Sequence, residues 1–182
     1  MKKTFIILLL IFITSAASAS IKEKVIKNLK DTKSLSFNFE QNINDKIENG
    51  FCKLLFPKKI FCEYNLSNQK ILVSNGKSVV IKTSSSYYFY SLKKTPLNLI
   101  LNKDYLINKI SKLEERMIDK KFINYNFFEN DYEKKIFFDY DNYNLIGWQT
   151  IDMYQNLSIT FLSSIKKNQK LENNLFKLPK RN

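Results

Sequence analysis

The fold class is decided by the stretch Gly50-Phe51-Cys52-Lys53-Leu54-Leu55-Phe56-Pro57-Lys58-Lys59-Ile60-Phe61-Cys62-Glu63-Tyr64, followed after a short polar gap by Lys70-Ile71-Leu72-Val73-Ser74-Asn75-Gly76. Its pattern predicts three successive antiparallel strands. Pro57-Lys58 marks the first reversal, because proline presets φ for a turn and cannot sit within a central strand. Asn75-Gly76 marks another, since both residues tolerate the positive φ that a tight hairpin needs.

The middle strand of this stretch carries aromatic side chains on both faces. Ile60, Cys62 and Tyr64 share one face, and Phe61 and Glu63 share the other, because side chains alternate along a strand. We therefore do not expect this strand to have simply one face in the core and one in water.

Two cysteines, Cys52 and Cys62, flank the predicted proline turn. A two-residue turn would place Cys52 opposite Glu63, whereas a three-residue loop over Phe56-Pro57-Lys58 would place it opposite Cys62. In an exported protein an even pair suggests a disulfide. The alternative is two buried apolar thiols, and the sequence leaves both open.

The N-terminus has the pattern of a secretory signal peptide. Two lysines precede an apolar run over residues 5–13, and the small-residue motif Ala17-Ser18-Ala19 follows. The run is too short for a membrane-spanning helix, which needs about 20 apolar residues. We expect residues 1–19 to be a signal peptide and residues 20–182 to form one exported domain, since that length suits a single core.

The charge balance is basic, with 30 Lys and Arg against 17 Asp and Glu, a formal charge of +13 and no histidine. The lysines form no dense run, so we favour a compositional bias, then a membrane-facing role, and expect no nucleic-acid partner. Histidine is the commonest general base and metal ligand, and two cysteines are too few for a cysteine-based zinc site. We expect no catalytic residue, metal or cofactor.

Two segments carry helical signals. Ser20 and Glu23 form a capping box at the start of residues 20–31. Thr95 is expected as the N-cap and Pro96 as the first residue of a second helix, which continues weakly to residue 110. The apolar positions are Ile21, Val25, Ile26 and Leu29 in the first helix, and Leu97, Leu99, Ile100 and Leu101 in the second. A helix that is apolar on most sides must be covered or must cover something.

Alternating patterns predict that most of the remaining chain is β. Leu35, Phe37, Phe39 and Gln41 share one strand face, and residues 44–49 are expected to be a loop. Further strands are predicted over residues 78–83, 87–92, 122–128, 135–140, 145–154 and 157–163, with residues 174–179 as a last strand or a docked end. The predicted fold class is mainly β (α+β): a strongly curved antiparallel sheet of roughly ten strands, with helices on its concave side and an apolar groove between them.

The order of these features resembles the periplasmic outer-membrane lipoprotein carrier family, LolA. The resemblance spans nearly the whole mature chain. The pieces that carry it are Leu35-Ser36-Phe37-Asn38-Phe39-Glu40-Gln41, the Gly50 to Tyr64 hairpin with Phe56-Pro57, Ile71-Leu72-Val73-Ser74-Asn75-Gly76-Lys77, Thr95-Pro96-Leu97, and Phe176-Lys177-Leu178-Pro179.

The resemblance implies an unclosed β-barrel, lidded by helices, that carries lipoproteins by their acyl chains through the periplasm. It implies an inner-membrane ABC-type release complex as a partner, and unloading at an outer-membrane acceptor or directly at that membrane. We expect a monomer and no enzymatic activity.

The resemblance also assigns lipid-binding residues. The implied positions are Phe37, Phe39, Ile60, Cys62 and Tyr64 in the cavity, Leu97, Ile100 and Leu101 in the lid, and Leu29 closing against the lid. Two positions depart from the family pattern. Phe56 stands where well-known members carry an arginine thought to hold the lid shut, and Cys62 stands where members often have tryptophan.

Two other functions remain as alternatives. A related lipid-groove fold could act as a sensor or signalling module, although an extra domain would then be expected. An exported enzyme is the other, but the acidic candidates lie in charged, turn-like segments typical of solvated residues. Those candidates are Glu114, Glu115, Asp139 and Asp141. Trp148 is expected in the core or the cavity wall.

Overall fold

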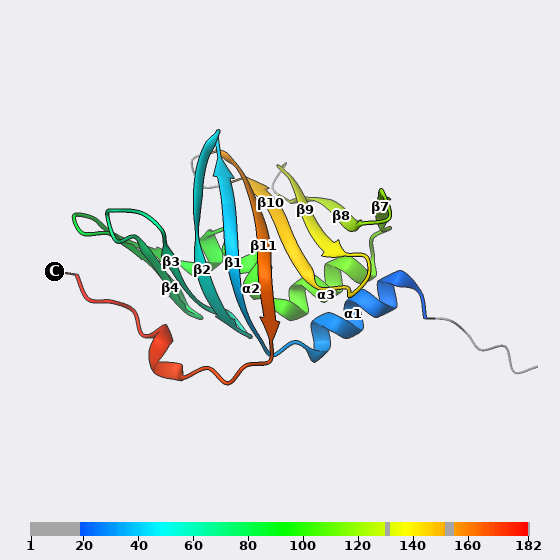
Figure 1. Cartoon of the computed structure of the whole chain (residues 1–182), viewed down its shortest axis with the longest axis horizontal. Coiled ribbons are helices and arrows are strands. Elements are labelled where there is room, and N and C mark those ends of the chain that lie inside the picture. The colour runs from blue at the N-terminus through cyan, green and yellow to red at the C-terminus, as the bar shows by residue number, and fades with distance from the viewer. Residues whose placement is uncertain (1–18, 130–131, 152–154, 182) are drawn as a thin grey trace, which may run out of the picture.

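The computed structural model describes residues 19–129, 132–151 and 155–181 (Figure 1). The predicted signal peptide lies almost wholly outside these residues, as does the end of the strand predicted over 145–154. Every described helix and strand lies between Ser20 and Arg181.

The described strands form one 11-stranded antiparallel sheet in the order β6-β5-β4-β3-β2-β1-β11-β10-β9-β8-β7. The strands are β1 (Ser34–Ile43), β2 (Lys46–Leu55), β3 (Lys59–Tyr64), β4 (Ile71–Asn75), β5 (Ser78–Lys82), β6 (Tyr87–Ser91), β7 (Arg116–Ile118), β8 (Phe122–Glu129), β9 (Tyr132–Asp139), β10 (Leu145–Ile151) and β11 (Leu157–Lys167). The sheet ends at β6 and β7 and is not closed, so it is the unclosed, helix-covered antiparallel barrel that the sequence predicts.

The sheet consists of two meanders that one pairing joins. β1 to β6 form the first and β7 to β11 the second, and each strand pairs with its neighbour in sequence. β1 pairs with β11 in the centre, with Phe39 opposite Leu162 and Gln41 opposite Thr160. The segment between the two meanders therefore has to cross the sheet, and its helices lie on the same face as the first helix (Figure 1).

Three α-helices cover that face: α1 (Ile21–Asp31), α2 (Leu97–Leu101) and α3 (Lys103–Ser111). The predicted capping box of α1 is confirmed, because Ser20 and Glu23 exchange side-chain to backbone hydrogen bonds. Asn102 interrupts the second helical stretch and caps α3 by accepting a hydrogen bond from Tyr105 N–H. The helices bury Val25, Leu29, Leu106 and Ile110 against one another and the sheet.

The prediction that the Thr95 side chain caps the second helix is wrong, although the backbone there has the expected conformation. The backbone of Thr95 is extended and Pro96 is already helical, but the Thr95 hydroxyl donates to the carbonyl oxygen of Leu92 at 2.8 Å. The reason is a 3₁₀ turn over Leu92–Lys94, which brings that carbonyl within reach. α2 therefore has no side-chain cap.

The loop expected over residues 44–49 is also wrong. Asn44 and Asp45 make the turn alone with φ values of 47° and 65°, and β2 begins at Lys46. The first part of β2 inverts the usual polarity, with Ile47 58% exposed and Glu48 5% exposed. Its polar composition hides the alternation that marks a strand.

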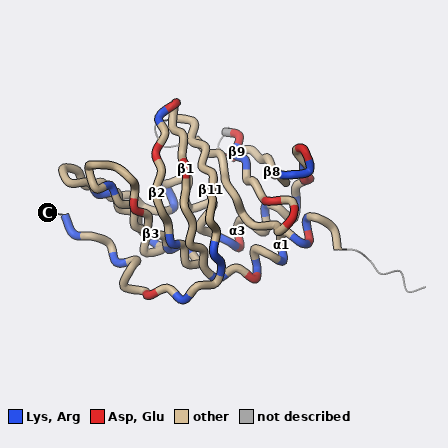
Figure 2. The backbone as a smooth tube through the Cα atoms, in the orientation of Figure 1, with Lys and Arg blue, Asp and Glu red and all other residues tan. Residues whose placement is uncertain are grey.

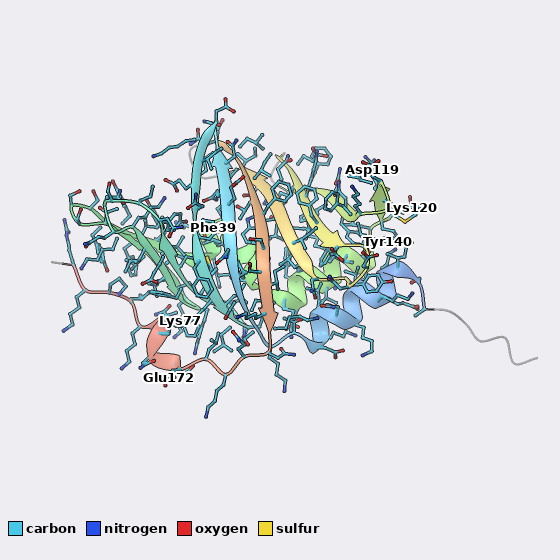
Figure 3. The ribbon with its side chains drawn as sticks, viewed as in Figure 1. Phe39, Lys77, Asp119, Lys120, Tyr140 and Glu172 are labelled. Carbon is cyan, nitrogen blue, oxygen red and sulfur yellow. A yellow bond between two sulfur atoms is a disulfide. The ribbon has the colours of Figure 1, made fainter. Side chains whose placement is uncertain are left out.

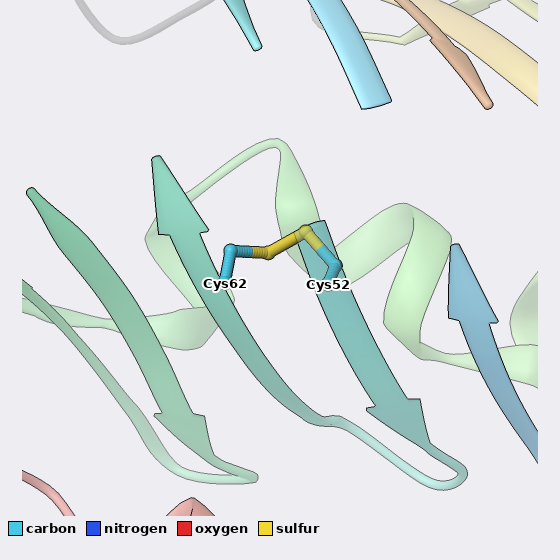
Figure 4. The surroundings of a disulfide bond; sticks show 2 residues. All are labelled: Cys52 and Cys62. Atoms are coloured by element: carbon cyan, nitrogen blue, oxygen red, sulfur yellow. A yellow bond between two sulfur atoms is a disulfide. The ribbon is translucent and has the colours of Figure 1, made fainter. Parts of the chain in front are cut away.

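The hairpin between β2 and β3 has the three-residue loop. Leu55 pairs with Lys59, so Phe56, Pro57 and Lys58 turn the chain and Cys52 lies opposite Cys62. The two cysteines form a disulfide across the neighbouring strands (Figure 4). A cross-strand link at this place fixes the register of the hairpin that carries Ile60 and Tyr64.

The C-terminal tail docks on the other face of the first meander. A short 3₁₀ helix, Asn173–Phe176, buries Phe176 to 2% exposure. Beyond it, Tyr87 donates a hydrogen bond to the Pro179 carbonyl oxygen. Val73 and Val80, which alternate with the cavity-side residues of β4 and β5, are buried as well. The tail is thus a docked end rather than a strand.

Helix α3 is tied to the β8–β9 hairpin by a charged cluster. The carboxylate of Glu129 accepts hydrogen bonds from the Tyr105 hydroxyl and the Lys134 ammonium group. Burial alone would raise the pKa of Glu129, but the hydrogen bonds from Lys134 and Tyr105 lower the pKa below its ordinary value. The cluster therefore stabilises the fold while Glu129 is ionised.

The disulfide closes a loop with a sequence separation of 10, which is expected to stabilise the fold by roughly 2.5–3 kcal/mol. Reduction of the wild-type chain, or the Cys52→Ala/Cys62→Ala change, should lower the free energy of unfolding by about this amount in urea titrations. Reductant should leave the double variant unchanged. An unaltered midpoint after complete reduction would contradict the expectation.

A carboxylate with a lowered folded pKa contributes stability above its unfolded pKa and loses it as the pH falls through the folded value. Glu129→Gln should therefore make the loss of unfolding free energy between about pH 5 and pH 3 shallower. Glu40→Gln, which removes an exposed carboxylate from β1, is the matched control. Identical pH profiles for the wild type and Glu129→Gln would refute the role of the cluster.

Candidate functional site

The concave side of the first meander holds two adjoining hollows beneath the start of α2. The outer hollow has a volume of about 200 Å³ and the inner one about 100 Å³. The residues that line both are Gln41, Tyr64, Leu72, Leu97 and Trp148. We treat the two hollows as one candidate site and call it the cavity.

Alternation along the strands supplies most of the cavity wall. The inner hollow is completed by Phe37, Phe39, Cys52, Ile60, Cys62 and Thr160. The outer hollow is completed by Ile43, Lys70, Val79, Ile81, Tyr90, Thr95, Pro96, Thr150 and Ser158. The inner hollow is mainly apolar and includes the disulfide, whereas polar groups gather in the outer one.

Gly50 allows two aromatic rings to meet in this wall. It pairs with Phe39 on one side and Tyr64 on the other, and those two rings lie edge to face with centroids 4.9 Å apart. A Cβ atom on Gly50 would come within 2.1 Å of the Glu63 carbonyl oxygen and 2.9 Å of the Phe39 ring. Figure 3 labels Phe39 among the side chains of the central strands.

Hydroxyl and amide groups form the polar part of the wall. Gln41 donates a hydrogen bond to the Ser158 hydroxyl at 2.8 Å across the β1–β11 pairing. The Thr160 hydroxyl is buried without a hydrogen-bond partner in the described structure. Thr160 thus places a polar group in the mainly apolar wall of the inner hollow.

One ion pair lies at the cavity. Lys70 pairs with Glu48, which is 5% exposed, and the Lys70 ammonium group also lies 4.1 Å from the centroid of the Tyr64 ring. Burial, and then the charge of Glu48, raises the pKa of the Tyr64 hydroxyl, which therefore stays protonated. The charges of Lys70 and Glu48 offset one another, so the wall carries little net charge.

The structure divides the nine predicted lipid-binding residues into two groups. Phe37, Phe39, Ile60, Cys62, Tyr64 and Leu97 line the cavity. Leu29, Ile100 and Leu101 are 3%, 1% and 0% exposed and pack in the core between helices and sheet. In α2, Leu97 thus reaches the cavity, while Leu99, Ile100 and Leu101 pack in the core.

Several wall residues were not predicted. Gln41, Val79 and Ile81 continue alternating patterns that the sequence displays, and Thr150 stands two residues after Trp148 on β10. These positions could have been found by extending the alternation. Lys70 had no such signal, because it precedes β4 and its place depends on the buried Glu48.

Hydrogen bonds made by the residues on either side of Asn102 hold the junction between α2 and α3 in place. The Lys58 N–H donates to the Leu101 carbonyl oxygen at 3.0 Å. The Lys103 ammonium group donates to the carbonyl oxygens of Lys30 and Thr32, each at 3.0 Å, and lies 5.4 Å from the centroid of the Phe56 ring. The cation beside the hairpin is therefore Lys103 at the start of α3, and the Phe56 ring packs against its ammonium group.

Two of the acidic candidates, Asp139 and Glu115, have structural partners. Asp139 accepts hydrogen bonds from the Asp141 and Asn142 N–H groups in a turn, and Glu115 pairs with Lys22 at 3.9 Å. The described residues contain no group of three or more His, Cys, Asp or Glu side chains placed to hold a metal ion. Within the same ranges, no helix has the length and apolar character that crossing a membrane requires.

The chain is similar to several solved structures at low sequence identity. The chain is similar to a protein from Thermus thermophilus, titled an uncharacterized conserved protein, with a TM-score of 0.53, 10% identity, and 88% of this chain and 93% of that chain covered. A LolA superfamily protein from Nitrosomonas europaea matches with a TM-score of 0.48, 10% identity and coverage of 87% and 96%. The Mycobacterium tuberculosis lipoprotein LppX matches with a TM-score of 0.45, 10% identity and coverage of 84% and 96%.

At this level of identity, the likeness to the Thermus protein shows the fold alone. No curated protein matches the chain. A model of the family described as "Outer membrane lipoprotein carrier protein LolA" matches residues 30–179, a range that contains every strand of the sheet together with α2 and α3. The chain therefore belongs to the LolA family of outer-membrane lipoprotein carrier proteins.

Proposed function

We propose that this chain is a periplasmic carrier that binds the acyl chains of lipoproteins in the cavity and moves them from the inner to the outer membrane. The observation that carries the proposal is the position of Leu97, which lines both hollows from the first turn of a short covering helix. Membership of the LolA family supports lipoproteins as the class of cargo.

The energetics suit a reversible carrier. Burying a methylene group is worth about 0.8 kcal/mol, so an acyl chain of ~15 carbons costs on the order of 12 kcal/mol to expose to water. The cavity must offer comparable apolar surface and still release its load. Its two hollows, about 200 and 100 Å³, together reach only the lower end of the roughly 300–1,000 Å³ range of ligand pockets. We therefore take this conformation as the closed one.

Cargo would enter by displacing the N-terminal end of α2. Leu97 belongs to the partly exposed end of the helix, whereas Ile100 and Leu101 are anchored in the core. The Lys58 and Lys103 hydrogen bonds hold the opposite end. In the empty state Leu97 covers the apolar wall, and in the loaded state an acyl chain takes over that surface.

The remaining expectations belong to the same proposal. Export by a cleaved signal peptide over residues 1–19 would deliver the domain to the periplasm. An inner-membrane ABC-type complex would load it, and an outer-membrane acceptor or that membrane itself would receive the cargo. The transfer cycle proposed here needs no covalent step, nucleotide or metal in this chain, and we propose a monomeric carrier rather than an enzyme.

Leu97→Glu should weaken binding of a fluorescent acyl lipopeptide at least about tenfold, because an ionised carboxylate is costly to bury in an apolar site. The folded state should be little affected, since Leu97 is partly exposed. Leu157→Glu makes the same change at a residue of β11 that is 40% exposed and is the matched control. Ile100→Glu is expected to destabilise the fold instead, because Ile100 is 1% exposed. Equal affinities for wild type and Leu97→Glu would refute the lid assignment.

Native mass spectrometry of the protein, purified gently from the periplasm of its host, tests the proposal. One acylated lipoprotein per chain is the expected result. Free fatty acid or phospholipid alone would indicate a general lipid-binding groove instead. A ligand-free chain that also fails to accept lipoprotein from inner-membrane vesicles would refute the carrier function.

A further inference from the structure

One edge of the sheet carries an unusual combination of exposed aromatic and cationic side chains. β6 is an edge strand, and on it Tyr88 is 49% and Phe89 is 58% exposed. The 3₁₀ turn that follows carries Lys93 and Lys94, both exposed. We call these four residues the β6 rim.

The β6 rim forms the edge of the sheet at the mouth of the cavity, with Tyr88 on the cavity side and Phe89, which pairs with Val80, on the opposite face. Tyr90 and Thr95, which border the rim in sequence, both line the outer hollow. The Tyr88 ring lies parallel to the Tyr90 ring, with centroids 6.5 Å apart and an interplanar angle of 4°. Tyr88 thus continues the cavity wall outward, and the two lysines stand immediately before the lid helix.

The charge around the β6 rim has a single sign. Residues 64–103 contain six lysines and no Asp or Glu, and they comprise β4, β5, β6 and α2. One of these lysines, Lys70, is offset by Glu48 of β2. Neither Lys93 nor Lys94 pairs with a carboxylate in the described ranges. Figure 2 shows where the basic and acidic residues lie along the described part of the chain.

The opposite edge makes a useful comparison. Exposed apolar side chains occur there too, including Met117 at 55% and Phe128 at 72%. Charges of both signs surround them, since Glu115, Arg116 and Asp119 stand on or beside β7. Exposed apolar surface alone therefore does not distinguish the β6 rim, but its combination with uniform positive charge does.

We propose that the β6 rim docks the protein onto an anionic lipid surface, with the mouth of the cavity at the membrane. Aromatic side chains favour the interface between head groups and acyl chains, and lysines near an anionic leaflet are attracted to it. The unpaired backbone of an edge strand cannot enter hydrocarbon, so the contact stays at head-group depth. Docking there brings the outer hollow next to the bilayer that would supply or receive an acyl chain.

Vesicle co-sedimentation tests the proposal with the chain from Ser20 to Asn182, which contains every described element of the fold. Phosphatidylcholine vesicles and mixed phosphatidylcholine–phosphatidylglycerol vesicles, both free of lipoprotein, are the two surfaces. We expect binding to the mixed vesicles, reversed by salt, and little binding to the neutral ones. Equal binding to both, or none to either, would overturn the proposal.

Matched variants locate the contact. Lys93→Gln/Lys94→Gln should reduce partitioning about 25-fold, since each lysine near an anionic surface contributes about a fivefold factor. Lys166→Gln/Lys167→Gln removes the same charge from exposed residues at the end of β11 and should have a much smaller effect. Equal losses of vesicle binding in the two double variants would indicate non-specific electrostatic attraction and would refute the β6 rim as the docking surface.

Aromatic and cavity variants complete the test. Phe89→Ser should weaken vesicle binding, whereas Phe128→Ser, at the opposite edge, should not. Leu97→Gln, which makes the cavity wall polar without adding a charge beside Lys93 and Lys94, should bind vesicles like the wild type, because the docking surface is separate from the cavity wall. Loss of vesicle binding in Leu97→Gln would mean that lipid uptake into the cavity, and not the β6 rim, retains the protein. The docking proposal rests on the carrier function, but the two are tested separately: lipoprotein binding tests the carrier function, and binding to lipoprotein-free vesicles tests the β6 rim.

Discussion

The pairing of β1 with β11 is the contact on which the rest of the structure depends. It joins two meanders that are separate in sequence, and Gln41 hydrogen-bonds to Ser158 across it. Because β6 and β7 are then the two free edges of one sheet, the connection from β6 to β7 has to cross one face of the sheet. It crosses the concave face (Figure 1), and because it contains α2 and α3 it covers the cavity.

The cover is firmly held on one side and lightly on the other. Ile100, Leu101, Leu106 and Ile110 are 1% exposed or less, and the cluster at Glu129 ties α3 to β8 and β9. Leu97 lies at the uncapped start of α2 and touches the cavity. In the proposed carrier, this cover would stay anchored at its C-terminal end and exchange Leu97 for an acyl chain at its N-terminal end without unfolding the domain.

Phe56 stands where the resemblance to the family leads one to expect an arginine, and the positive charge comes instead from Lys103. Phe56 lies beneath the Lys103 ammonium group, which donates to the C-terminal end of α1. Carbonyl oxygens at a helix C-terminus favour a cation there. The positive charge at the hairpin and α1 therefore comes from the first residue of α3, and the hairpin contributes an aromatic ring and the Lys58 N–H.

The sequence by itself determined the features that depend on local geometry. The alternation of Phe37 and Phe39, the capping box at Ser20 and the turn at Pro57 follow from periods and turn chemistry within a few residues, and the structure has each of them. The sequence did not predict the strand through residues 46–49, because the buried Glu48 forms its ion pair with Lys70 only in the folded chain. Tertiary structure alone decided the loop that brings Cys52 opposite Cys62, the inward place of Lys70, and the burial of Leu29, Ile100 and Leu101 in the core. Apolar periodicity says that a residue is covered, but only the packing of distant strands and helices decides whether it is covered by protein or faces a cavity.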